Sequence, residues 1–126
     1  MTALSRAKDG LFTQFEVQRG LSAQRLVNYF TQEKGQWQIN SALRQMVQFE
    51  VHNLLHNPSR FGMFDMIFCR NVLIYFDLEV KQQILAHLAR QLRPGGALVL
   101  GASETLVGVT NQFVASSEMP MVFQLV

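Results

Sequence analysis

The sequence predicts an α/β domain built around a mainly parallel sheet, and two apolar runs with a helix between them carry that prediction. Phe64 to Cys69 is almost entirely apolar, which is typical of a strand covered on both faces. A long amphipathic segment follows, and then a second apolar run from Ala97 to Ala102. Strand, helix and strand within about forty residues indicate a βαβ unit, whose strands are parallel and whose crossover is right-handed.

The helix of this unit is predicted from Leu78 to Leu92. Asp77 precedes it as an N-cap, and Glu79 places a negative charge in the favourable first turn. Apolar residues at helical spacing form one stripe, which we expect to face the sheet. These residues are Val80, Ile84, Leu85, Leu88 and Leu92. The turn Arg93-Pro94-Gly95-Gly96 ends the helix.

Shorter elements are predicted on both sides of this unit. Before it we expect a helix from Thr2 to Lys8 that ends at Gly10, a helix capped by Ser22 that runs to Phe30, a small β-hairpin within Thr31 to Asn40, and a helical turn from Ser41 to Gln45. Val47 to Val51 alternates apolar and polar residues, as a half-buried strand does. After the unit, Phe113 to Ala115 and Met121 to Val126 are predicted to close the sheet as an antiparallel pair.

Composition excludes several classes of protein. The 126 residues are 48% hydrophobic and 16% charged, which suits one small globular domain. A net charge of +2 without a long basic run gives little support for nucleic-acid binding. One cysteine forms no internal disulfide, and the apolar runs are too short to span a bilayer. We therefore expect a cytoplasmic protein without a nucleic-acid partner, membrane insertion or a metal centre.

Polar residues that follow the predicted strands mark the candidate ligand site, because open parallel sheets bind ligands beyond the carboxyl ends of their strands. Three places qualify: Asn53 to Leu55, Cys69 to Val72, and Gly101 to Glu104. Arg70 and Asn71 end a very apolar strand and need water, a ligand or backbone as partners. Tyr75 lies in the next apolar run, from where its phenol could point back over the strand ends.

Three stretches of the chain carry a resemblance to a known family. Phe64-Asp65-Met66-Ile67-Phe68-Cys69-Arg70-Asn71-Val72-Leu73-Ile74-Tyr75-Phe76-Asp77 resembles the signature of CheR-type chemotaxis receptor methyltransferases. Val47 to Leu55 is also similar to the family pattern, and so are Leu92 to Gly96 and then Leu98 to Glu104. The fourteen-residue block is highly specific, whereas the Pro-Gly-Gly turn is common to many methyltransferases. The similarity runs from about Ser5 to Val126.

The resemblance implies a partial Rossmann-like methyltransferase domain that uses S-adenosylmethionine, releases S-adenosylhomocysteine, and esterifies glutamate side chains on the cytoplasmic domain of chemoreceptors. By family analogy, Asn53 and Leu54 line the adenine side of the cofactor pocket. Arg70 and Asn71 lie under the cofactor and touch it partly through backbone groups. Tyr75 matches the family tyrosine near the transferred methyl group. A carboxylate is already nucleophilic at neutral pH, so the reaction requires no general base.

The chain also departs from the family pattern. It contains no G-x-G-x-x-G run between a strand and a helix, and no match to the acidic residue that follows the family's second strand. We therefore expect the isolated chain to bind the cofactor weakly, and a rival interpretation is a non-catalytic, truncated interaction module of the chemotaxis system. The two strands that separate Val47–Val51 from Phe64–Cys69 in the family order are also missing, so we expect self-association through an exposed sheet edge or a rearranged sheet.

The resemblance further implies a small inserted β-subdomain at about residues 29–46. In some family members a longer, glycine-rich hairpin in this subdomain grips a pentapeptide at the receptor's tail. The segment from Tyr29 to Ile39 is shorter and resembles members that do not need the pentapeptide. Trp37 and Tyr29 form either a protein-contact surface or only the small core of this hairpin.

Each candidate residue also has a structural interpretation. Arg70 and Asn71 alone could cap a strand end, and Tyr75 alone could be a core aromatic. Cys69 is expected to pack, and Asp65 to accept backbone hydrogen bonds. Glu104 either touches substrate or, as we favour, caps a helix starting near Ser103. His52, His56 and His87 lack metal-ligand spacing, and we expect His87 on the polar side of its helix.

Overall fold

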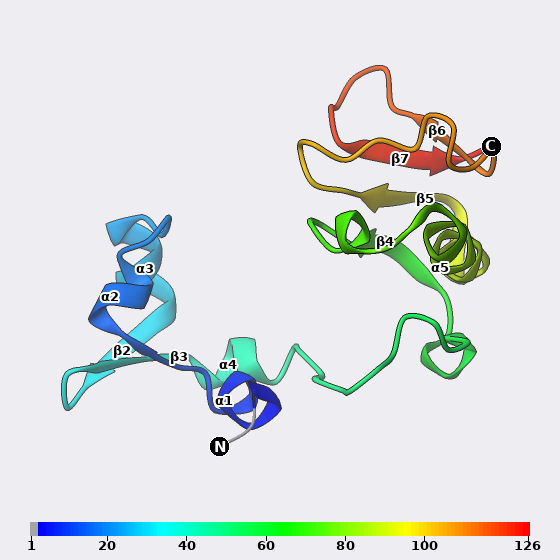
Figure 1. Ribbon diagram of the computed structural model, residues 1–126. Coiled ribbons are helices and arrows are strands. Elements are labelled where there is room, and N and C mark those ends of the chain that lie inside the picture. Colours follow the sequence, from blue (N-terminus) through cyan, green and yellow to red (C-terminus); the bar gives the residue numbers. More distant parts are fainter. Residues whose placement is uncertain (1–2) are drawn as a thin grey trace. The chain divides into compact units, whose positions relative to one another are not determined.

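A computed structural model describes residues 3–126, which divide after Val51 into two compact units (Figure 1). Each unit holds one sheet. The first sheet contains strands β1 to β3 and the second contains strands β4 to β7.

The first unit is a three-stranded antiparallel sheet with short helices, in the strand order β1-β3-β2. Its elements are α1 (Ala3–Asp9), β1 (Leu11–Thr13), α2 (Gln14–Val17), α3 (Ala23–Tyr29), β2 (Phe30–Glu33), β3 (Gln36–Ile39) and α4 (Ser41–Arg44). The predicted hairpin, the turn of helix after it and the helix capped by Ser22 are all confirmed. The Ser22 hydroxyl accepts a hydrogen bond from the Arg25 amide at 3.2 Å. The first predicted helix is present as α1, and Thr2 lies outside the described residues.

The hairpin has a two-residue turn. Glu33 pairs with Gln36, and both residues between them, Lys34 and Gly35, have positive φ values of 50° and 77°. Two consecutive positive φ angles match the right-handed twist of tight hairpins, and glycine adopts such angles without steric cost. β1 pairs with β3 on its other side and was not predicted, because its three residues show no clear alternation.

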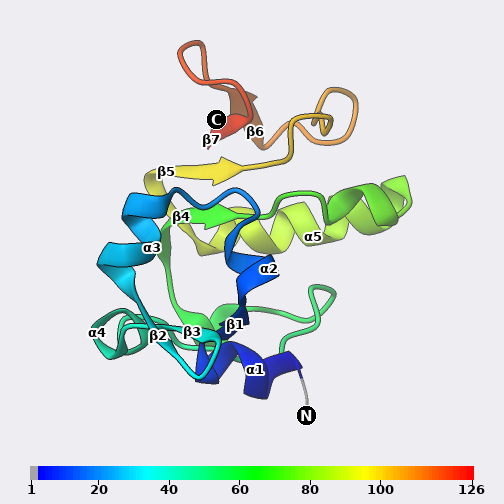
Figure 2. The same ribbon diagram turned by 90° about the vertical axis from the view of Figure 1, so that its left-hand side faces the viewer.

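The second unit is a four-stranded sheet in the order β4-β5-β7-β6, with the long helix α5 against it (Figure 2). Its elements are η1 (Ser59–Phe61), β4 (Phe64–Phe68), η2 (Leu73–Tyr75), α5 (Leu78–Gln91), β5 (Leu92–Val99), β6 (Phe113–Ala115) and β7 (Val122–Leu125). The predicted βαβ unit and the closing antiparallel pair are confirmed: β4 and β5 are parallel, and β6 pairs antiparallel with β7.

The core of this unit lies between α5 and the sheet. Ile84, Leu85, Leu98 and Leu100 are fully buried, and Leu88 and Leu92 are nearly so. The predicted apolar stripe therefore faces the sheet as expected. The Asp77 carboxylate accepts a hydrogen bond from the Val80 amide at 3.0 Å, which confirms the predicted N-cap.

Four predictions about the strands were wrong. The larger sheet is mixed rather than mainly parallel, since β7 joins β5 and β6 by antiparallel pairing. Residues 47–51 form no strand, and neither sheet of the described residues includes them. Alternation shows which side chains would share a face, but a strand also requires a neighbour for its backbone ladder. β5 begins at Leu92, so residues Arg93–Gly96, predicted as a turn, are part of the strand. The pairing register with β4 shifts there, between Phe64 and Met66.

The fourth correction concerns β4, which is not covered on both faces. Phe64, Met66 and Phe68 are 38%, 50% and 68% exposed. β4 is an edge of its sheet, because β5 pairs with one side of it and no other strand of residues 3–126 pairs with the opposite side. The strand is as apolar as a central strand but occupies an edge position.

Candidate functional site

The carboxyl ends of β4 and β5 lie side by side and are tied together beyond the last paired residues of the strands. The Cys69 amide donates to the Val99 carbonyl at 2.9 Å. The Arg70 side chain donates from Nε to the Leu100 carbonyl at 3.2 Å. Two of the three predicted places, the residues after Cys69 and those after Leu100, therefore form one cluster, as expected for adjacent parallel strands.

Glu104 connects the two strand ends. Its Oε1 accepts hydrogen bonds from the Asn71 amide at 2.7 Å and from the Gly101 amide at 2.8 Å. Its Oε2 is buried and has no hydrogen-bond partner in the described part of the chain. The distances are typical of charge-assisted bonds, in which a carboxylate satisfies backbone donors that no strand can pair.

The backbone of this cluster is tightly constrained. Asn71 has a φ of 59°, in the left-handed region that residues with a Cβ rarely adopt. A Cβ at Gly101 would lie 2.2 Å from the Asn71 Oδ1 and 2.9 Å from the Glu104 Oε1. A side chain at position 101 would therefore displace the ends of the Asn71 and Glu104 side chains from their present positions.

The structure separates the roles of Arg70 and Tyr75. The Arg70 guanidinium lies across the end of β5 and also contacts the Met121 sulfur at 3.7 Å, so this side chain makes structural contacts of the kind that the strand-end interpretation predicts. Tyr75 ends η2 with 81% of its surface exposed, which excludes the interpretation as a core aromatic. An exposed phenol shortly after the polar turn at 70–71 is available to a ligand there.

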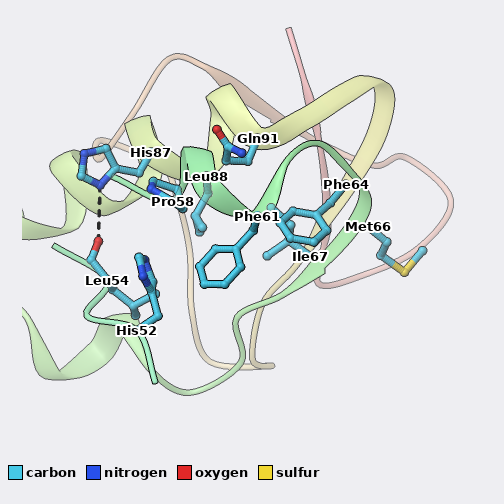
Figure 3. A pocket seen from close by; sticks show the side chains of 10 residues that line it. All are labelled: His52, Leu54, Pro58, Phe61, Phe64, Met66, Ile67, His87, Leu88 and Gln91. Atoms are coloured by element: carbon cyan, nitrogen blue, oxygen red, sulfur yellow. Dashed lines mark hydrogen bonds between the residues drawn. The ribbon is translucent and has the colours of Figure 1, made fainter. Parts of the chain in front are cut away.

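Asn53 and Leu54 do not join this cluster. The Asn53 Oδ1 accepts from the Leu55 amide at 2.9 Å in a local turn. Leu54 lines a largely apolar hollow of about 290 Å³ between the segment before β4 and the last turns of α5. Figure 3 shows the Phe61 ring at the centre of this hollow, between His52 and Phe64. The hollow lies beside the amino-terminal and middle part of β4, whereas Arg70 and Asn71 follow its carboxyl end.

His87 and Gln91 supply polar groups to the hollow. The His87 Nδ1 lies 3.4 Å from the Leu54 carbonyl, a long contact in which the ring nitrogen must donate (Figure 3). The Gln91 side-chain Nε2 donates to the Gly62 carbonyl. His87 is half-buried, so its expected position on the polar side of α5 was wrong. The segment around Leu54 covers this side chain. The spacing of apolar residues along α5 cannot predict which other segment packs on the helix.

Two carboxylates differ from their expected roles. Asp65 is exposed and pairs with Arg93 at 3.0 Å instead of accepting backbone bonds. Glu104 caps backbone amides, as we favoured, but these amides lie at two strand ends, and no helix starts near Ser103.

Cys69 is 6% exposed and packs as expected. Burial, with a smaller contribution from the Glu104 charge, raises the pKa of the Cys69 thiol.

A βαβ unit with a constrained polar turn at the carboxyl ends of two parallel strands defines an α/β ligand-binding domain. Comparison with protein families then identifies the kind: residues 1–122 match the CheR methyltransferase SAM-binding domain, and the chain belongs to that family. The cofactor of this family's domain is S-adenosylmethionine. The resemblance read from the sequence is therefore confirmed.

Curated relatives support the same assignment. The chain is 43% identical over 113 residues to the chemotaxis protein methyltransferase Cher2 of Pseudomonas putida, covering 89% of this chain and 41% of the relative. It is 45% identical over 111 residues to chemotaxis protein methyltransferase 1 of Pseudomonas aeruginosa, covering 87% and 40%. It is 35% identical to the chemotaxis protein methyltransferase of Salmonella typhimurium over 87% and 40%. The chain thus spans about two fifths of the length of these relatives.

The helices of the described residues include none with the length and apolar character that a membrane crossing requires.

Proposed function

We propose that this chain forms part of the S-adenosylmethionine site of a protein methyltransferase that esterifies glutamate side chains on chemoreceptors. The observation that carries the proposal is the turn at Arg70–Asn71 at the carboxyl ends of β4 and β5, in which Glu104 binds the amide of a left-handed Asn71. Family membership supports the cofactor, and the names of the relatives support a role in chemotaxis.

The residues present fit this cofactor in chemical terms. The Glu104 carboxylate, whose Oε2 is buried and unpartnered, places a negative charge next to the exposed turn, and this charge favours a positively charged ligand without touching it. S-adenosylmethionine carries an ammonium and a sulfonium group. We assign Arg70 and Asn71 to the floor of its site, Tyr75 to the side of the transferred methyl group, and Asn53 and Leu54 to the adenine side. A cofactor that contacts all five must reach from the polar turn along β4 to the hollow that Leu54 lines.

When bound, the cofactor supplies a methyl group on a sulfonium leaving group. The acceptor of that methyl group would be a glutamate carboxylate oxygen of the receptor. The nucleophile is already ionised at neutral pH, so this chain's task is to align the reactants and exclude water. The exposed Tyr75 hydroxyl is the side chain we assign to orienting the groups around the methyl.

The second candidate is a non-catalytic interaction module of the chemotaxis system. Its support is that these 126 residues contain no G-x-G-x-x-G run, the usual backbone cradle for a nucleotide-like cofactor. In this case the exposed aromatic side chains of the first unit, such as Phe15 and Tyr29, would contact a protein partner.

A replacement experiment separates the two candidates. The segment of the Pseudomonas putida relative that aligns with this chain is replaced by this chain, and methyl transfer from labelled S-adenosylmethionine to a chemoreceptor cytoplasmic domain is measured. Base-labile label on receptor glutamates is expected. The unchanged relative is the positive control. A folded hybrid that binds the receptor without transferring methyl groups contradicts the enzymatic proposal and favours the interaction module.

The isolated chain provides a second measurement. Calorimetric titration with S-adenosylhomocysteine is expected to show binding at least about a hundredfold weaker than in the hybrid, because each missing charge-assisted contact removes about 1.5–3 kcal/mol. Equal affinities in the chain and the hybrid would show that the described residues hold the cofactor by themselves.

A further inference from the structure

We infer that Glu104 is a positioning residue for the cofactor: its carboxylate fixes the backbone of Asn71 and Gly101, and thereby the floor on which the cofactor rests. This inference rests on the proposed function and adds to it a residue that contacts backbone rather than reacting atoms. It also explains why a carboxylate lies half-buried at the end of an apolar sheet.

The first step of the argument is the geometry of one acceptor shared by two donors. Oε1 receives the Asn71 amide at 2.7 Å and the Gly101 amide at 2.8 Å. One donor belongs to the turn after β4 and the other to the turn after β5, so a single atom sets the distance between the two strand ends. Because the acceptor is charged, these bonds are shorter and stronger than those that a neutral acceptor makes.

The second step is the conformation that these bonds hold. Asn71 has a φ of 59°, which is unfavourable for a residue with a side chain unless its surroundings fix it. The space beside Gly101 is filled by Asn71 and Glu104 atoms, so the three residues interlock. Without the carboxylate, the Asn71 amide loses its acceptor and the turn gains access to ordinary backbone conformations.

The third step separates this role from general support of the fold. The segment that carries Glu104 has its own anchors: Leu106 is 5% exposed, and the Gln82 side-chain Nε2 donates to the Val109 carbonyl at 3.0 Å. The carboxylate also borders a small hollow of about 150 Å³ that Lys81 lines from α5. Removing the charge should therefore loosen the turn while the sheet and α5 keep their packing.

The fourth step is the unpartnered oxygen. A buried carboxylate oxygen without a donor is costly, so a purely structural bridge would be served better by a fully satisfied group. We expect a residue with such an unfavourable buried oxygen where the backbone that it holds in place contacts a ligand. The exposed side of the same turn, Arg70 and Asn71, is where we place the cofactor.

Amide hydrogen exchange on the 126-residue chain tests the bridge without cofactor. Glu104→Ala is expected to lower the protection of the Asn71 and Gly101 amides at least about tenfold, while amides in the middle of α5 keep theirs. Glu104→Gln retains a neutral acceptor and should give an intermediate loss. Glu118→Ala, which removes an exposed carboxylate from the loop between β6 and β7, is the matched control and should change neither amide. Unchanged protection in Glu104→Ala overturns the inference.

The hybrid enzyme tests the positioning role. Glu104→Ala is expected to raise the KM for S-adenosylmethionine about tenfold or more, with a smaller change in kcat, and Glu118→Ala to change neither. The effect should shrink in an Asn71→Gly background, because glycine adopts positive φ without help. A full-sized effect in that background, or an unchanged KM, overturns the inference. If the exchange result holds in a hybrid that transfers no methyl group, the proposed function fails alone.

Discussion

The residues of the candidate site differ in what they do through side chains and what they do through backbone. Arg70 and Asn71 were predicted as polar ligands at a strand end, yet the Arg70 side chain is bound to the end of β5. We therefore expect the turn to offer a ligand mainly its free backbone groups and the side-chain carboxamide of Asn71. The side chain of Tyr75, in contrast, is exposed, so its position does not indicate a role in packing.

For Tyr75→Phe in the hybrid enzyme, we expect kcat to fall about tenfold or more, which corresponds to about 1.4 kcal/mol of transition-state stabilisation. The affinity for S-adenosylhomocysteine should change little, because a group that acts near the methyl contributes mainly in the transition state. Arg70→Ala should instead lower both kcat and the affinity for S-adenosylhomocysteine, because the hydrogen bond from Arg70 to the end of β5 is lost. Full kcat in Tyr75→Phe would remove its assigned role.

Cys69 gives a prediction on pH. Burial raises the pKa of its thiol above the ordinary value of 9.0, so the folded state holds the proton to higher pH than the unfolded state does. The contribution to stability is complete below the ordinary thiol pKa and is lost as pH rises through the raised one. Urea unfolding of wild type and Cys69→Ser is expected to show a steeper loss of stability above about pH 9 in wild type. Parallel profiles in the two proteins would contradict this.

Among the elements, α5 could be predicted almost completely and β5 only in part. The limits of α5 depend on local signals, namely the Asp77 cap and a stripe of apolar residues at helical spacing. The start of β5 depends on its register against β4, a pairing between residues about thirty positions apart. The Glu104 bridge was missed for the same reason, since Asn71 and Glu104 are distant in sequence. The signal that could have indicated it was a carboxylate directly after a strand that ends in glycine.

The Asp77 cap can be tested on the helix it begins. Asp77→Ala removes the acceptor of the Val80 amide and a negative charge from the amino end of α5. We expect it to lower the free energy of unfolding by about 1 kcal/mol, within a range of about 0.5–2. Gln83→Ala, at an exposed position in the middle of the same helix, is the control and should cost almost nothing. Urea midpoints measure both, and equal midpoints would show that the cap adds no stability.

The hairpin of β2 and β3 leads to a prediction about recognition. Its turn has only Lys34 and Gly35, so it is shorter than the glycine-rich version that the resemblance associates with pentapeptide binding. An added peptide strand needs pockets for its side chains as well as a sheet edge. We expect the free receptor pentapeptide to bind the chain more weakly than about 1 mM. A family member with the longer hairpin is the positive control, and micromolar binding to this chain would refute the prediction.

At the scale of the whole molecule, the exposed edge of β4 leads to a prediction about association in solution. The edge carries Phe64, Met66 and Phe68 with large exposed surfaces, and no strand of residues 3–126 pairs with it. Proteins normally protect such edges with charge, bulges or covering segments, because unpaired backbone groups accept a strand from another chain. Every other copy of the chain presents an identical edge, so we predict self-association through β4.

Sedimentation at several protein concentrations measures this association, and the average mass is expected to rise with concentration. Met66→Lys places a charge on the edge and should shift the distribution towards the monomer, because a lysine opposes strand addition. Val114→Lys is the matched control: Val114 is similarly exposed, at 53% against 50% for Met66, but lies on β6 at the opposite edge of the same sheet, where only three residues could pair. A monomer at all concentrations, or an equal effect of both lysines, would show that β4 is not the contact.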